Sequence, residues 1–580
     1  MSYRDELLKA YNEGNFLNAV YDCLSADHEA RQEVVFELAS LHNEKLVDVV
    51  EAFSALSNGS ANGPDFFLTR DVFQQALPHI DAAVLPVMRC VLNLYRSAGQ
   101  DFAAGTIVGQ FVEYCARQLP RSRDALTEIE ANPNDFSDLL AATLSAGFRS
   151  DCQTFLLHAV RLSKDANIDL RRGAVISIAN FDSQGNAAFL EEAVAGIESC
   201  VDREIEDSVL AASLRTIYAL LRQDGNQEER FTELIAKVLS KGNEFTIHAA
   251  SEVLFLHTAA LPEPLVGMLL SNLTRVKPTH KGTLDNIDYG ISHLIKGGSP
   301  ESAIRWLEGM LLTHPKELSI GMFDSVVGVI LGDNVLLSKI LTRWLVLGER
   351  ALCSAVHDIV AGAYHREERL LEIDISELQS TDAVHMFFLA RKIIGYLFMQ
   401  PISAASLMVS LMRQTEDVEV LAELGALLFD PLLLNYTGKV REYAVQQVNV
   451  ENGKVKEALE EAIKAVDEYL EGLRSVGVLP ALYPSTAQRE AYRRQFSRQM
   501  TKSMEEVEEK SVFSKLFTKS VLLYGGKSIN YVHGVNGQMH RMETPLHSHG
   551  VEIEFPRMQN LDPFGLDYML RVFRNERFQA

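Results

Sequence analysis

DLRRGAVISIANF, residues Asp169 to Phe181, is the stretch that decides the fold of this chain. As a helix it carries one apolar face at three- and four-residue steps, made of Leu170, Ala174, Ile178 and Phe181. Gly173 and Ala174 place two small residues at its middle. The pattern predicts a helix that lets a partner helix approach closely.

The small residue at the centre of this face recurs downstream. It is found at Ala174, Ala212, Ala250, Gly290, Ser325, Ala355 and Ala390, spaced by 38, 38, 40, 35, 30 and 35 residues. A period of this length is typical of helical-hairpin repeats, in which each pair of helices packs against the next. The sequence therefore predicts a mostly α protein built as an α-solenoid.

The run from Asp169 to Ala174, together with the period, resembles HEAT or armadillo-type repeat proteins. The second helix of that family opens with an acidic residue, an apolar residue, an arginine and small residues. Other units depart from it, and Thr216 stands where an apolar residue would follow Ala212. The resemblance implies a fold class rather than a function. We expect Arg171 and Arg172 to serve the start of the helix and contacts between repeats, rather than a ligand.

Composition breaks divide the chain into four expected parts. An N-terminal helical segment, 1–60, ends in the polar loop SNGSANGPD. The HEAT-like solenoid is expected over 66–440, and two long helices, Lys454 to Arg474 and Thr486 to about Lys510, over 450–510. Residues 511–580 are predicted to form a small separate domain.

That last segment changes period from helical to two-residue alternation. VLLYGGKSINYVHGVNGQMHRMETPLHSHGVEIEFPR predicts three or four antiparallel strands, with a hairpin turn at Asn536-Gly537. DPFGLDYMLRVFRNERF then predicts an amphipathic helix that covers one face of the sheet. The fold prediction is thus a solenoid followed by a small C-terminal α+β domain with an antiparallel sheet.

Charge and cysteine usage restrict the class of partner and the compartment. The formal charge is −23, so the chain as a whole repels nucleic acid, although 14 Lys and Arg against 11 Asp and Glu follow residue 480. Six scattered cysteines without a CxxC pair indicate free thiols in a reducing compartment. The acidic start MSYRDELLKAYNEG lacks an apolar signal segment, which favours a cytoplasmic location.

One apolar stretch requires a membrane check. Ile393 to Met412 holds 20 residues without a charge, but Gln400 and Pro401 stand at its centre. Two buried helices that meet at the proline fit this pattern better than a membrane span. We therefore expect no membrane partner.

Four histidines within 17 residues form the candidate metal site: His533, His540, His547 and His549. A two-residue turn at Asn536-Gly537 would place His533 directly opposite His540. Four imidazoles, or three with Glu552 or Glu554, could hold zinc or another divalent ion. The simpler interpretation is a solvated polar hairpin, and no other cofactor is indicated.

A histidine–aspartate pair at His357-Asp358 resembles the centre of metal-dependent phosphohydrolases, with His314, Asp417 or Asp430 as conceivable partners. Stacked repeats would hold these residues on separate units. A capped or buried histidine is therefore the preferred interpretation.

Five basic residues on the second long helix form the candidate contact surface for a partner or for nucleic acid: Arg489, Arg493, Arg494, Arg498 and Lys502. Glutamates follow at 505, 506, 508 and 509. A solvated or partner-facing helix is favoured over nucleic-acid contact.

These observations favour a non-enzymatic, cytoplasmic helical-repeat scaffold that binds another protein. The first alternative is a nucleic-acid-associated or regulatory subunit of a multi-component bacterial system such as phage defence. The second is a metal-dependent enzyme that uses the C-terminal histidines.

Overall fold

The computed structural model describes residues 3–578 except 27–30, 59–63, 100, 102, 184–185, 224–227, 299, 364–368, 379, 478–483, 511–516, 524–526, 534–538 and 546–553. The chain forms two compact units, Met1–Gly332 and Asp333–Ala580. No single described helix is both long and apolar enough to cross a membrane, although Asp324–Gly332 and Asn334–Leu347 pass that test when taken together.

The first unit begins with a group of packed helices. They are α1 (Tyr3–Asn12), α2 (Phe16–Ala26), α3 (Arg31–Asn43), α4 (Val49–Ser54), α5 (Phe66–Ala76), α6 (Val84–Ala98), α7 (Thr106–Ala116), α8 (Leu119–Ala131) and α9 (Pro133–Phe136). α3 packs against α5 and α4 against α6, so the helices before the 57–65 loop share a core with those after it.

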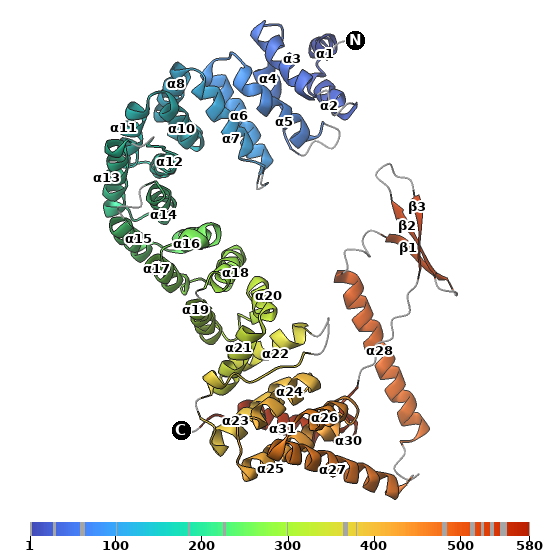
Figure 1. Cartoon of the computed structure of the whole chain (residues 1–580). Helices are drawn as coiled ribbons and strands as arrows, with labels where there is room; N and C mark the ends of the chain where they lie inside the picture. The colour runs from blue at the N-terminus through green and yellow to red at the C-terminus, as the bar shows by residue number, and fades with distance from the viewer. Residues whose placement is uncertain are drawn as a thin grey trace. The chain divides into compact units, whose positions relative to one another are not determined.

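Two rows of helices make up the rest of this unit (Figure 1). The inner row is α10 (Leu140–Ser150), α12 (Ile168–Ala179), α14 (Asp207–Leu221), α16 (Glu244–His257), α18 (Lys281–Lys296) and α20 (Asp324–Gly332). The outer row is α11 (Cys152–Leu162), α13 (Ala187–Arg203), α15 (Glu228–Lys241), α17 (Glu263–Leu273) and α19 (Pro300–Thr313). Each inner helix contacts the next inner helix, and each outer helix the next outer one. This stacking fits a helical repeat.

The quoted stretch forms α12 as predicted. Leu170, Ala174 and Ile178 are buried, and Phe181 is 1% exposed just beyond the helix end. A Cβ atom on Gly173 would lie 3.1 Å from the Cβ of Leu140 in α10. The small residue therefore lies where the preceding inner helix packs closely, as the pattern predicted.

The second unit holds α21 (Asn334–Leu347), α22 (Arg350–Ala363), α23 (Ala383–Leu397), α24 (Pro401–Met412), α25 (Val418–Leu427), α26 (Lys439–Val450), α27 (Gly453–Val476), α28 (Thr486–Lys510), α30 (Met558–Leu561) and α31 (Pro563–Asn575). α24 begins at Pro401, and all of its residues are buried. The apolar stretch from Ile393 to Met412 is thus two buried helices, as expected.

The prediction of a separate C-terminal α+β domain is wrong. Most of the described residues are helical, and the last helix, α31, packs against α23 of the helical body instead of closing a small domain. Three strands are present as an antiparallel ribbon in the order β1 (Phe517–Leu523), β2 (Lys527–His533) and β3 (Met539–Pro545). The apolar side of the last helix was correctly predicted, but its partner is α23.

Candidate functional site

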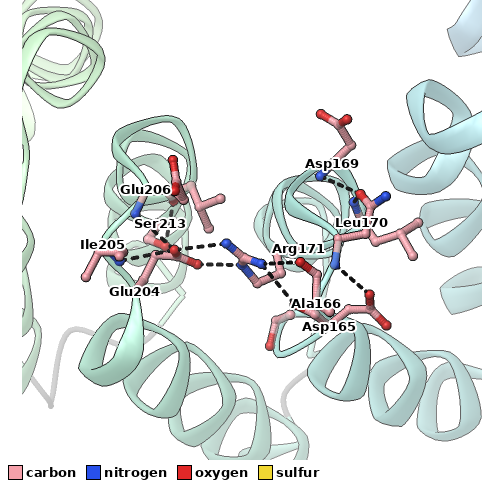
Figure 2. Close-up of polar contacts among 12 residues, drawn as sticks. Asp165, Ala166, Asp169, Leu170, Arg171, Glu204, Ile205, Glu206 and Ser213 are labelled. Atoms are coloured by element: carbon pink, nitrogen blue, oxygen red, sulfur yellow. Dashed lines mark hydrogen bonds and ion pairs between the residues drawn. The ribbon is translucent and has the colours of Figure 1, made fainter. Parts of the chain in front are cut away.

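Arg171 joins two consecutive hairpins of the first unit (Figure 2). Its Nε donates to Oε2 of Glu204 at 2.8 Å and its Nη2 to Oε1 at 3.2 Å. Its Nη1 donates to the carbonyl oxygens of Asp165 and Ala166, both at 3.0 Å. Every nitrogen of the guanidinium therefore has an acceptor within the protein.

Glu204 is the buried partner of this pair, with a side chain only 4% exposed. Its Oε1 also accepts from the backbone N–H groups of Ile205 at 3.1 Å and Glu206 at 3.0 Å, just before α14. Burial raises the pKa of Glu204, but the Arg171 hydrogen bond, the two backbone donors and the Arg171 charge outweigh it, so the pKa lies below its usual value.

Arg172 makes a different and more exposed contact. Its guanidinium lies 3.0 Å from Oδ1 of Asp169, and the two side chains are 40% and 51% exposed. These contacts agree with the expectation that Arg171 and Arg172 serve the helix start and the joint between repeats.

Carboxylates of one hairpin also cap the inner helix of the next. Asp207 accepts from the backbone N–H groups of Asn243 at 2.6 Å and Phe245 at 2.7 Å, at the start of α16. Asp288, which is 6% exposed, accepts from those of Ser325 and Val326, both at 2.9 Å, at the start of α20. A carboxylate at a helix N-terminus satisfies free N–H groups and complements the helix dipole.

A groove of about 650 Å³ in the first unit is lined by residues of α7, of α10 and of the segment just beyond the end of α12. Five of its lining residues are small and are called its floor here: Gly105 just before α7, Gly109 on α7, and Ala141, Ala142 and Ser145 on α10. Val108, Val112 and Phe148 also line the groove. A Cβ atom on Gly105 or Gly109 would meet no atom within 4 Å. The floor therefore lets another polypeptide approach the helix backbones closely.

Polar residues stand along the edge of this groove. Nη1 of Arg149 lies 2.8 Å from Oε1 of Glu113, which joins α10 to α7. Beyond the C-terminus of α12, Nδ2 of Asn180 donates to Oγ of Ser145 at 3.3 Å, and Asp182 also lines the groove. An apolar floor with a polar edge is the usual composition of a protein-binding surface.

The C-terminal helix of the second unit is held on α23 by several buried or half-buried polar contacts, which include a hydrogen bond from Nε of Arg574 to the carbonyl oxygen of Gly395. Lys392 is 0% exposed, and its Nζ donates to the carbonyl oxygens of Arg574 at 2.8 Å and Glu576 at 2.6 Å. Arg391 makes a two-point ion pair with Glu576, with distances of 2.8 and 2.6 Å. Burial lowers the pKa of Lys392. Sequence analysis missed this role, although a lysine inside the apolar run FFLARKIIGYL was a signal of it.

A polar cavity of about 630 Å³ opens between α22, α23 and α31. It is lined by Arg350, Ser354, His357, Asp358, Tyr396, Asp567, Arg571, Arg574 and Asn575. Nδ1 of His357 is buried there without a hydrogen-bond partner among the described residues. Burial lowers the pKa of His357. The charge of Asp358 opposes this, and the charge of Arg574 lowers the pKa further. The guanidinium groups have the chemistry of an oxyanion-binding surface, balanced by the two carboxylates.

The phosphohydrolase-like arrangement is not assembled around this pair. Neither Asp417 nor Asp430 lines the cavity that holds His357 and Asp358. Within the described ranges, no group of three or more histidine, cysteine, aspartate or glutamate side chains is arranged to hold a metal ion. His357 is half-buried, as the simpler interpretation expected.

The strand register differs from the one predicted for the histidine cluster. His533 pairs with Met539, and His540 pairs with Val532, so the two histidines do not stand opposite each other. The observed register therefore differs from the predicted one by one residue. His547 and His549 lie outside the described residues.

The basic residues of the second long helix lie on α28, where every described side chain is exposed. Arg489, Arg493, Arg494, Arg498 and Lys502 occupy its first two thirds. Nη2 of Arg494 lies 3.4 Å from Oε2 of Glu490 on the same helix. The structure thus places the predicted contact residues together on one solvated helix.

Comparison with known proteins adds little to this description. No protein-family model matches the chain, and no curated protein does. One solved structure, described as that of an engineered protein, covers 80% of this chain and 99% of its own at 12% sequence identity, with a TM-score of 0.18. A similarity this low carries no argument about fold or function.

Proposed function

We propose that this protein is a non-enzymatic, HEAT-like scaffold that binds another protein along the inner row of its first unit, within a cytoplasmic complex. The groove over α7, α10 and the end of α12 is the observation that supports this proposal most strongly. Its small-residue floor suits a tightly packed polypeptide better than a small molecule, because a drug-sized ligand requires deeper enclosure.

The repeat arrangement supports the same proposal. Consecutive hairpins expose one helix face each, and together these faces make the extended surface that solenoid proteins use for binding. The thiols are consistent with a reducing compartment, since all six cysteines are free and five are buried. Burial raises the pKa of Cys90, Cys115 and Cys353 to about 12, which keeps them protonated and unreactive.

Two glycines provide a matched test. Gly109 on the groove floor and Gly267 on outer helix α17 are both exposed, and a Cβ at either would meet no atom within 4 Å. Gly109→Trp therefore meets no clash at its Cβ and places an indole in the groove, while Gly267→Trp places the same bulk on the outer row. We expect quantitative co-purification to recover a partner with the wild type and the Gly267→Trp variant, and to lose it with Gly109→Trp.

The partner recovered must then bind the purified chain in isolation, with the same difference between the two tryptophan variants. Equal binding by both variants, or no partner with the wild type, would overturn the proposal.

A further inference from the structure

A row of large apolar side chains lies open to solvent on α28. Tyr492, Phe496, Met500 and Met504 follow one another at four-residue steps and are 68%, 58%, 50% and 68% exposed. Residues at four-residue steps form a continuous ridge on a helix surface, and such ridges interdigitate when two helices pack. Contiguous exposed apolar surface of this kind marks an interaction site.

Charges flank this ridge in a fixed order. Arg489 and Arg493 accompany its first half, while Glu505 lies on the equivalent flank beyond its second half, and the sequence continues with glutamates at 506, 508 and 509. The side chains of Arg489 and Arg493 make no hydrogen bond or ion pair with another described residue. The helix is therefore basic at one end, acidic at the other and apolar along the ridge between.

This pattern is complementary to itself when the helix is reversed. A two-fold axis through position 498 places Tyr492 opposite Met504 and Phe496 opposite Met500 of a second helix. The same operation brings Arg489 and Arg493 to within two positions of Glu509 and Glu505. A parallel pair would instead set arginine against arginine and glutamate against glutamate, which is unfavourable.

We propose that α28 is a homodimerisation element, which pairs antiparallel with α28 of a second copy of this chain. The contact is isologous, since each copy presents the same ridge and the same two charged ends. Charge complementarity identifies the partner as a second copy of the chain. In the antiparallel pair, the acidic end of one α28 faces the basic end of the other.

The size of the contact sets the expected strength. α28 has 25 residues, and a helix of that length extends about 37 Å. The proposed contact is a single helix pair, which is small beside stable interfaces of roughly 1,200–2,000 Å², so dimerisation should depend on concentration in the micromolar range. Mass measured by sedimentation should rise from one chain of 64.6 kDa toward two as concentration increases.

The ridge is tested with the full-length chain. We expect Phe496→Asp combined with Met500→Asp to hold the protein monomeric at every concentration at which the wild type dimerises. Phe245→Asp is the matched control, because Phe245 on α16 is 64% exposed and should leave the mass unchanged. A wild type that stays monomeric to the highest soluble concentration, or a dimer that survives both ridge substitutions, would overturn the proposal.

The charged ends are tested by exchange. The double variant Arg489→Glu, Arg493→Glu carries glutamate at all four flanking positions. The double variant Glu505→Arg, Glu509→Arg carries arginine at all four. Like charges then face each other in each homodimer, so each variant alone should dimerise at least tenfold more weakly. An equimolar mixture should recover a mixed dimer, since only unlike chains then match. Failure of the mixture to recover would contradict the antiparallel arrangement.

Nucleic acid is the competing occupant, and fluorescence anisotropy with a labelled single-stranded oligonucleotide distinguishes it. Salt-sensitive binding by a chain that remains monomeric would overturn the dimer proposal. Absence of binding beside a concentration-dependent dimer supports it.

Discussion

Arg171 and Glu204 form a two-point ion pair across consecutive hairpins, 33 residues apart in the chain, with a shorter distance of 2.8 Å between Nε and Oε2. The pair is nearly closed to solvent, since the side chains are 16% and 4% exposed. Contacts of similar sequence separation follow along the same unit, such as Asp207 with Phe245 and Asp288 with Val326. Polar contacts between consecutive hairpins therefore recur at about the same sequence spacing as the small residues.

Removal of Arg171 should destabilise this joint strongly. Arg171→Ala leaves the Glu204 carboxylate buried with backbone donors only, and loss of one partner of a buried pair costs about 3–5 kcal/mol. We expect hydrogen exchange of backbone amides in α12 and α14 to accelerate accordingly. Arg172→Ala is the control, because its pair with Asp169 is exposed and such pairs contribute about 0–1 kcal/mol. Equal effects of the two substitutions would contradict a structural role specific to Arg171.

Acid should weaken the same joint. The pKa of Glu204 is lower in the folded chain than in the unfolded one, so its contribution is complete above the unfolded pKa of about 4.3 and is lost as pH falls through the folded value. Glu204→Gln should remove that part of the acid dependence in the exchange of α12 and α14 amides. An unchanged acid profile in the variant would show that other carboxylates account for it.

Two glycine substitutions should act in opposite directions. A Cβ at Gly290 in α18 would lie 2.7 Å from Cγ of Leu254, so Gly290→Ala should cost about 1–3 kcal/mol by overpacking. Gly267→Ala in α17 meets open space and should stabilise its helix by about 1 kcal/mol. Thermal unfolding and amide exchange of the two helices measure the difference, and a stabilised Gly290→Ala would refute close packing there.

His42 should make the N-terminal helices sensitive to mild acid. Its Nδ1 accepts from the backbone N–H of Val49 at 3.2 Å, a bond that protonation abolishes. Burial lowers the pKa of His42, and Asp48 and Asp81 offset this only in part. The unfolded chain therefore binds more protons, and stability falls as pH falls through about 6.5.

Amide exchange in α3 and α4, compared at about pH 7.5 and 5.5 after correction for the intrinsic rate, should show this loss. His42→Asn keeps an acceptor near the position of Nδ1 but does not titrate. The loss should therefore disappear in this variant, and its persistence would assign the pH dependence to another group.

Lys392 should control the attachment of the C-terminal helix. Lys392→Met removes the Nζ donor from the carbonyl oxygens of Arg574 and Glu576, and only Arg574 keeps another donor, the Tyr396 hydroxyl at 3.5 Å. A buried acceptor that loses its donor costs about 1–3 kcal/mol. Limited proteolysis should then cut near α31 while the first unit stays intact. Lys464→Met, at a lysine that is 75% exposed on α27, should change nothing measurable. Resistance of the Lys392→Met variant to proteolysis would show that the other contacts suffice.

Local signals predicted the helices well. Lys454 to Arg474 was expected as a helix, and α27 covers that range and ends at Val476, with Gly477 at a φ of 70°. α28 begins at Thr486, as the sequence indicated. Periodicity, charge spacing and glycine at a positive φ are properties of the segment itself, so they can be read without its neighbours.

The prediction failed where a segment's partner lies far away in the chain. The last helix has an apolar side, but nothing within it says whether a nearby sheet or α23, nearly 200 residues earlier, will cover that side. The predicted histidine pairing failed because a register difference of one residue between two strands changes every pair along them. Asp207 and Asp288 were missed because an aspartate that caps a distant helix resembles any surface aspartate.

The capping carboxylates make the two ends of the first unit unequal in their effect on stability. Asp207 accepts hydrogen bonds from the start of α16, and Asp288 from the start of α20, so a later hairpin depends on an earlier one for the end of its inner helix. Loss of the later hairpin leaves a carboxylate that water can solvate, whereas loss of the earlier one leaves bare amides at a helix terminus. Truncation from the two ends is therefore unequal, and the unit should tolerate shortening from its C-terminal side better than from its N-terminal side.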